Sequence, residues 1–145
     1  MNTLYKTITS LVYFSSLRHI IDKANMAQTL TTEGPFTLLG PYDGAFSAYT
    51  TYDPDDLLHE FPKTDLDALL SSETLARKAI LSILVGGRLT FSDLKSYTTI
   101  TTLNGKDLSI VGTNGNLIIQ NSFMLNSDIE CSNGIIHVTD ELIQP

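Results

Sequence analysis

The sequence predicts an α+β domain, with helices before about residue 85 and mainly β-strands after it. Apolar residues recur at helical spacing in the first part of the chain. In the second part, segments rich in Ile, Val, Thr and Leu alternate with Asn-Gly pairs at 104–105, 114–115 and 133–134. Asn-Gly predicts a tight β-hairpin because both residues accept the positive φ angles of a type I′ turn. Helices that precede hairpins, rather than alternate with strands, indicate an α+β fold.

The first quarter of the chain predicts two helices, and Asn2 is placed to cap the first of them. The apolar positions at helical spacing are Leu4, Ile8, Leu11, Val12, Phe14, Leu17, Ile20 and Ile21. This spacing continues across the region where a signal peptide would be cleaved, and no small-residue cleavage site follows. We therefore expect mature structure here and no signal peptide in this chain.

A buried strand and further helices are predicted next. The apolar run FTLLG predicts the strand, Pro41 ends it, and Asp43 is placed to cap a short helix. Ser72 or Thr74 opens a longer helix, which Gly86-Gly87 terminates. Glycine and proline thus stand at the ends of the predicted elements rather than inside them.

The stretch ECSNGIIHVTD, residues 130–140, contains the only cysteine of the chain and one of its three histidines. A turn at Asn133-Gly134 would pair Cys131 with Ile136 and Glu130 with His137. Side-chain alternation then places Cys131 and Ile136 on an apolar face, and Glu130 and His137 on the opposite face. Because this geometry separates the thiol from the imidazole, we expect a hairpin with a buried cysteine rather than a catalytic dyad.

Known sequence signatures of chemistry are missing elsewhere in the chain. The glycines match neither phosphate-binding spacing, and the serines include no G-x-S-x-G nucleophile turn. Asp53, Asp55 and Asp56 resemble the start of a calcium loop, but the glycine and the distal acid of that loop are missing. His19 and His59 have no second ligand at metal spacing. We expect no catalytic residue, no metal site and no cofactor.

Composition limits the classes of function further. Nine basic and 16 acidic residues give a net charge of −7, a field that repels phosphate backbones, so we expect no nucleic-acid partner. We also expect no transmembrane segment, since no apolar stretch is long enough to cross a bilayer. A chain of 145 residues is the size of one ordinary domain, and no linker or repeat divides it.

Three blocks of the sequence resemble, in order and spacing, the conserved blocks of fasciclin (FAS1) domains. They are GPFTLLGPYDGAFSAY, LSILVGGRLTFSDLK and the last 43 residues from LNGKDLSIVG to the end of the chain. The resemblance implies a single FAS1-like domain over residues 1–145, with N-terminal helices packed on a wedge of mainly antiparallel β-strands. The residues that match the family motifs, for which a structural role is implied, are Gly34, Pro35, Phe36, Pro41, Asp43, Ala45, Phe46, Gly87, Asn104, Gly105, Asp128, Ile129, Asn133, Gly134, Ile136, His137 and Val138.

The function that the resemblance implies is non-catalytic binding, in adhesion or matrix contact outside the cell, with a protein or a glycan as partner. Animal adhesion members often carry Tyr-His before an apolar pair and Pro-Gly in the middle block, a motif linked to integrin binding. Here Ser82 and Ile83 occupy those positions, with Gly86 in place of the proline, and we expect Ile83 to be buried. Two alternatives remain: a carrier of a small hydrophobic ligand such as a lipid or pigment, held between the helices and the β-wedge, and an enzyme.

Overall fold

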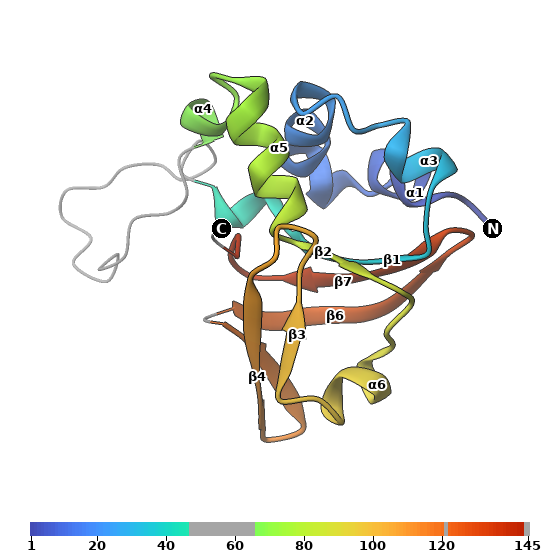
Figure 1. Ribbon diagram of the computed structural model, residues 1–145, viewed down its shortest axis with the longest axis vertical. Helices are drawn as coiled ribbons and strands as arrows, with labels where there is room; N and C mark the ends of the chain where they lie inside the picture. The colour runs from blue at the N-terminus through green and yellow to red at the C-terminus, as the bar shows by residue number, and fades with distance from the viewer. Residues whose placement is uncertain (47–65, 121, 144–145) are drawn as a thin grey trace, which may run out of the picture.

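The computed structural model describes residues 1–46, 66–120 and 122–143 (Figure 1). The helical elements in chain order are α1 (Leu4–Ser10), η1 (Val12–Phe14), α2 (Ser15–Lys23), α3 (Thr29–Thr32), η2 (Asp43–Ala45), α4 (Leu66–Leu69), α5 (Glu73–Leu81) and α6 (Phe91–Lys95). The strands are β1 (Phe36–Pro41), β2 (Leu84–Gly86), β3 (Thr99–Thr101), β4 (Asp107–Thr113), β5 (Asn116–Ile119), β6 (Ser122–Cys131) and β7 (Gly134–Thr139).

The strands form one seven-stranded sheet in the order β2-β1-β7-β6-β5-β4-β3. Neighbouring strands are antiparallel except β1 and β7, which are parallel. Helices α1, α2, α3 and α5 lie on one side of β1 and β7, whereas α6 lies on the other side (Figure 1). The predicted α+β class is confirmed. The sequence analysis did not predict α6.

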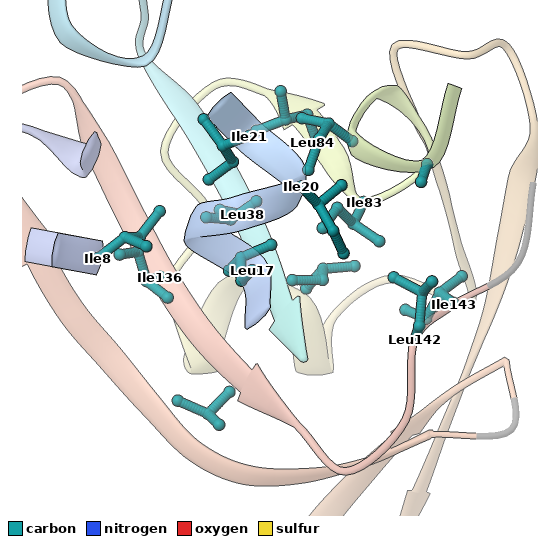
Figure 2. Close-up of a cluster of buried hydrophobic side chains, with 14 of the residues drawn as sticks. Ile8, Leu17, Ile20, Ile21, Leu38, Ile83, Leu84, Ile136, Leu142 and Ile143 are labelled. Carbon is teal, nitrogen blue, oxygen red and sulfur yellow. The ribbon is translucent and has the colours of Figure 1, made fainter. Parts of the chain in front are cut away.

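The main core lies between the helices and the β2-β1-β7 part of the sheet. Figure 2 shows Leu17 and Ile21 of α2 close to Leu38 of β1, and Ile8 of α1 close to Ile136 of β7; all of these side chains are buried. The helical spacing read from the sequence therefore selected core residues correctly at most of its positions. Each such aliphatic side chain contributes about 1.5–3 kcal/mol through burial, so this interface holds the helices on the sheet.

Two details of the N-terminal helices differ from the prediction. Thr3, not Asn2, caps α1, because its hydroxyl accepts a hydrogen bond from the Lys6 amide at 3.2 Å. Val12 was predicted on the apolar face but is 89% exposed. The reason is that α1 ends at Ser10 and the next residue, Leu11, has extended backbone angles, which interrupts the helical spacing.

The predicted helix of the middle block is present, and Ser72 caps α5 by accepting from the Leu75 amide at 3.0 Å. Ile83 is fully buried, as predicted, although it follows the helix instead of lying within it. Asp43 does not cap its own short helix. Its carboxylate instead accepts from the Ser16 amide at 2.8 Å, at the N-terminus of α2, and so joins two segments far apart in the sequence.

The predicted register of the last hairpin is wrong. Cys131 pairs with Gly134 and Glu130 pairs with Ile135, so the turn lies at Ser132-Asn133. Neither Asn133 nor Gly134 has a positive φ angle. The pairing differs by two residues, an even number, so side chains keep their predicted faces while their partners change.

The other two Asn-Gly pairs differ from each other. Asn114 and Gly115 have φ angles of 49° and 79°, and they connect β4 to β5 in the predicted two-residue turn. At the other pair only Gly105 has a positive φ, of 82°, and the connection from β3 to β4 is longer. The Asn104 amide there donates to the Leu81 carbonyl at 3.1 Å, which attaches the connection to the end of α5.

Candidate functional site

Asn133 joins three segments through its side chain. Its Oδ1 accepts from the Leu4 amide at 2.8 Å, and its Nδ2 donates to the Leu30 carbonyl at 2.9 Å and the Glu33 carbonyl at 2.8 Å. Its backbone carbonyl accepts from the Phe36 amide at 3.1 Å. These bonds satisfy one of the free amides at the start of α1 and the carbonyls at the end of α3. The side chain therefore connects the N-terminal helices to the last hairpin, and the backbone carbonyl connects that hairpin to β1.

Other residues of the family motifs make similar long-range links. The Asp128 carboxylate accepts from the Phe91 amide at 2.8 Å and so holds the N-terminus of α6 against β6. Asp128 itself has a φ angle of 58°, in a region where β6 and β7 shift register. The guanidinium of Arg88 donates to the Cys131 carbonyl at 2.8 Å. In this structure these side chains hold separate segments of the fold together.

Many of the remaining motif residues lie at buried or turn positions. Phe46, Ala45, Ile136, His137, Val138 and Gly134 are buried, and Pro41 is the last residue of β1. The neighbouring Tyr42 is half-buried against the core. Gly87 has a φ angle of 91°, where an L side chain would be strained, and its carbonyl accepts from the Thr37 hydroxyl at 2.8 Å.

Cys131 and His137 do not form a reactive pair. The Cys131 thiol is fully buried on the helix-facing side of the sheet, with its Sγ 3.4 Å from the Thr7 hydroxyl oxygen. His137 lies on the opposite face, against the Leu89 backbone. Burial raises the pKa of the Cys131 thiol, while the hydrogen bond with Thr7 and the charge of Arg88 lower it by less. The thiolate, which is the nucleophilic form, is therefore disfavoured.

We expect Cys131 to react slowly with a thiol reagent in the folded protein and quickly after denaturation. Both the exclusion of the reagent by burial and the raised pKa act in this direction. The measurement is the rate of release of a chromogenic thiol-exchange product with and without denaturant. Equal rates in the two conditions would show that the thiol is accessible and that the buried position is wrong.

His137 is a buried neutral imidazole. Its Nδ1 accepts from the Asp128 amide at 3.2 Å, so the proton is on Nε2, which donates to the Leu89 carbonyl at 2.7 Å. Burial lowers the pKa of His137, and the Leu89 carbonyl and the Asp128 carboxylate oppose this shift. The predicted pairing of His137 with Glu130 is wrong, because Glu130 is exposed and lies opposite Ile135.

The lowered pKa of His137 predicts that the folded protein becomes less stable as the pH decreases. Above the ordinary histidine value of 6.5 the ring is neutral in both the folded and the unfolded chain. As the pH falls below this value, the unfolded chain binds the proton first, so protonation favours unfolding. Nitrogen NMR of the ring should show the neutral Nε2–H form persisting below pH 6.5 in the folded protein. A folded-state pKa at or above 6.5 would contradict this prediction.

Metal-binding groups are not clustered in the part of the chain that the structure describes: no three His, Cys, Asp or Glu residues lie close enough to hold an ion. His19 is exposed on α2. His59 and the acidic group Asp53, Asp55 and Asp56 lie outside the described residues. Within the described ranges no helix is long and apolar enough to cross a membrane.

The surface feature that stands out is a row of apolar side chains on the solvent-exposed face of strands β4, β5 and β6. Val111 of β4 pairs with Ile118 of β5, which pairs with Phe123 of β6. Leu125 follows two residues after Phe123 along β6. Val111, Phe123 and Leu125 are 54%, 46% and 53% exposed. Cross-strand neighbours share a face with Cβ atoms about 5 Å apart, so these four residues, the apolar row, form one strip, in which Ile118 is half-buried and the other three are exposed.

The apolar row is exposed because the opposite face of its strands is the one that the fold buries. The alternate residues of the same strands, among them Ile110, Leu117, Ile119 and Met124, are buried on the other face of the sheet. These strands are therefore apolar on both faces, and only one face is covered. Apolar strips on a soluble surface commonly mark sites of protein contact. The sequence analysis did not predict this exposed apolar face.

A comparison with known families matches residues 12–145 to the fasciclin domain. The chain belongs to the fasciclin domain family. The fold agrees: a FAS1 domain pair from the insect cell adhesion molecule fasciclin I superposes with a TM-score of 0.76 at 17% identity, covering 99% of this chain and 51% of that one. The resemblance to the fasciclin family and the predicted FAS1-like fold are thus confirmed.

Two relatives show the range of proteins that contain this domain. The uncharacterized protein sll1735 of Synechocystis sp. is 29% identical over 130 residues, which cover 90% of this chain and 88% of the relative. Stabilin-2 of Rattus norvegicus is 30% identical over 139 residues, which cover 94% of this chain but only 8% of the relative. The domain thus occurs in proteins of very different length, and no enzyme family is indicated by these matches.

Proposed function

We propose that the chain is a single fasciclin domain, residues 1–145, that acts outside the cell or at its surface as a non-catalytic binding module. Its partner is a protein or a glycan of a cell surface or matrix. Membership of the fasciclin family supports this proposal, as does the likeness to a domain pair from a cell adhesion molecule. The motif residues that the structure describes have structural roles in the fold, and this favours a binding function over a catalytic one.

The observation that carries the proposal is the apolar row. It lies on paired strands, so its side chains are held in position before a partner arrives, which lowers the entropic cost of binding. Aromatic side chains such as Phe123 are typical of the residues that dominate interface energies. By contrast, the space between the helices and the sheet is filled by fully buried aliphatic side chains (Figure 2). This packing favours binding at the surface over a ligand carried inside.

The middle block is a poor candidate for the same role. Ser82 is 1% exposed and Ile83 is fully buried, so neither side chain is available to a partner. The Ser82 hydroxyl donates to the Lys78 carbonyl at 2.7 Å and accepts from the Asn104 amide group at 3.2 Å. We therefore propose that binding does not use integrin-type recognition at this block.

Binding of the purified domain to cells and matrix of the organism that produces it tests the proposal. We expect saturable binding that weakens about tenfold when Phe123 and Leu125 are both replaced by serine, as for a central apolar contact. Val12→Ser is the matched control, because Val12 is an exposed apolar residue of the helical layer. Absence of saturable binding to either material, or location of the native protein inside the cell, would contradict the proposal.

A further inference from the structure

We propose that the apolar row binds a protein segment whose apolar side chains are accompanied by lysine or arginine. This inference rests on the binding function proposed above and names the chemistry of its partner. It follows from the shape of the row and from the charges that surround it.

The shape of the row fits an extended or flat apolar segment. Val111, Ile118 and Phe123 stand opposite one another on three consecutive strands, and Leu125 lengthens the strip along β6. A partner that covers this strip must present several apolar side chains at comparable spacing on one face. An extended segment with alternating apolar residues does so, because every second side chain points the same way.

The part of the chain that carries the row is acidic. Residues 99–145 contain five acidic residues, Asp107, Asp128, Glu130, Asp140 and Glu141, against one basic residue, Lys106. Four of the seven excess negative charges of the chain are therefore in this part. A partner with the opposite charge is attracted to the row and oriented on it.

One of these carboxylates lies at the row itself, and a second lies on the same face of β4. Asp140 accepts from the Phe123 amide at 2.9 Å, so its charge lies directly beside the aromatic residue of the row. Asp107 lies on β4 four residues before Val111, an even number, and so on the same face. Its carboxylate accepts from the Thr101 hydroxyl at 2.6 Å, which fixes its position.

The same charges argue against other occupants. The acidic surface would repel anionic membranes and sulfated glycans. This repulsion would outweigh any apolar or hydrogen-bonding contact that they could make with the surface. A second copy of this chain would bring an equally acidic face against the first, since each carries a charge of −7. A basic protein segment has neither disadvantage.

The test uses the whole domain and a synthetic ten-residue peptide in which lysine alternates with valine, leucine and phenylalanine. Two peptides serve as controls, one with glutamate in place of lysine and one with the same composition in separate blocks. We expect the first peptide alone to perturb NMR amide signals of β4, β5 and β6. We expect its Kd to rise about threefold or more when salt is raised from about 50 to about 300 mM.

Substitutions separate the apolar from the electrostatic contribution. Phe123→Ser should raise the Kd for the lysine peptide about tenfold, while Val12→Ser should leave it unchanged. Asp107→Asn and Asp140→Asn keep their hydrogen-bond acceptors and should together raise the Kd several-fold. Glu73→Gln, an exposed acid of α5, should have no such effect. Thermal melts of each variant identify any loss of folding.

Several results would overturn the inference. They are equal binding of the glutamate peptide, signal changes on the helical layer, equal effects of Val12→Ser and Phe123→Ser, or binding to phosphatidylserine vesicles or self-association through the row. If cell or matrix binding persists and depends on Phe123 but not on Asp107 and Asp140, the proposed function stands and the basic partner is wrong. If cell and matrix binding is absent while the lysine peptide binds as expected, the proposed function fails and the surface preference remains.

Discussion

Replacing Asn133 by alanine is expected to lower the free energy of unfolding by about 3 kcal/mol or more, because the change leaves three partners unsatisfied, one at the start of α1 and two at the end of α3. The Leu4 amide loses its acceptor at the start of α1, and the Leu30 and Glu33 carbonyls lose their donor. Leu4 and Leu30 are fully buried, and each buried group that is left without a partner costs about 1–3 kcal/mol, whereas the carbonyl of the exposed Glu33 can bond to water instead. The helices would also lose their connection to the last hairpin.

Chemical denaturation of the variant measures this loss, and Asn126→Ala is its control. Asn126 is exposed, and within the described residues its Oδ1 accepts a local bond from the Ser127 amide at 2.9 Å. Asn133→Asp is a second informative variant, since it keeps the acceptor for Leu4 but places a carboxylate oxygen against two carbonyls. We expect it to be destabilising as well. A loss below about 1 kcal/mol in Asn133→Ala would mean that water replaces the side chain at little cost.

The role of Asn133 could not be predicted from local sequence. Asn-Gly indicates a type I′ turn wherever the backbone is free to adopt it, and at Asn114-Gly115 it does so. At Asn133 the side-chain amide is bonded to residues about a hundred positions earlier in the chain, and the turn moves to Ser132-Asn133. The pattern is the same in both places, and tertiary contacts decide between the two outcomes.

Periodicity predicted the buried face of the helices and of the last hairpin because each follows from a repeat that the backbone imposes. Cys131 and Ile136 keep their shared face even though their predicted pairing is wrong. The helix α6 could also have been predicted. Thr90 and Asp93 form a capping box there, and the spacing of these two residues is a known signal for a helix start.

The apolar row could be predicted only in part. A two-residue turn at Asn114-Gly115 already places Val111 opposite Ile118. It does not tell which face of the hairpin is covered, since Ile110 and Ile119 are as apolar as Val111 and Ile118. Strands with apolar residues on both faces carry no alternation to decide the question. The rest of the fold decides it, by covering one face and leaving the other in solvent.

Replacing Gly134 by valine should have the largest effect, a loss of more than about 4 kcal/mol or failure to fold. The type I′ turn that the sequence predicts at Asn133-Gly134 would make this substitution harmful through a positive φ angle, but Gly134 has no positive φ, so that reason is wrong. The cause is a close approach of two backbones. Gly134 is opposite Phe36 in the parallel β1–β7 pair, and a Cβ at Gly134 would collide with the Phe36 carbonyl oxygen.

Backbone atoms cannot move aside as the end of a flexible side chain can, so even Gly134→Ala should separate β1 from β7 locally. Gly112→Val is the matched control. Gly112 is also in a strand and has no positive φ, and a Cβ there would meet only ordinary contacts, the nearest being Leu117 Cδ2 at 3.9 Å. Valine suits an exposed strand position, so thermal melts should show this control unchanged or slightly more stable. Equal melting temperatures for Gly134→Ala and Gly112→Val would mean that β1 and β7 are not joined as described, because the described pairing leaves no room for a Cβ at Gly134.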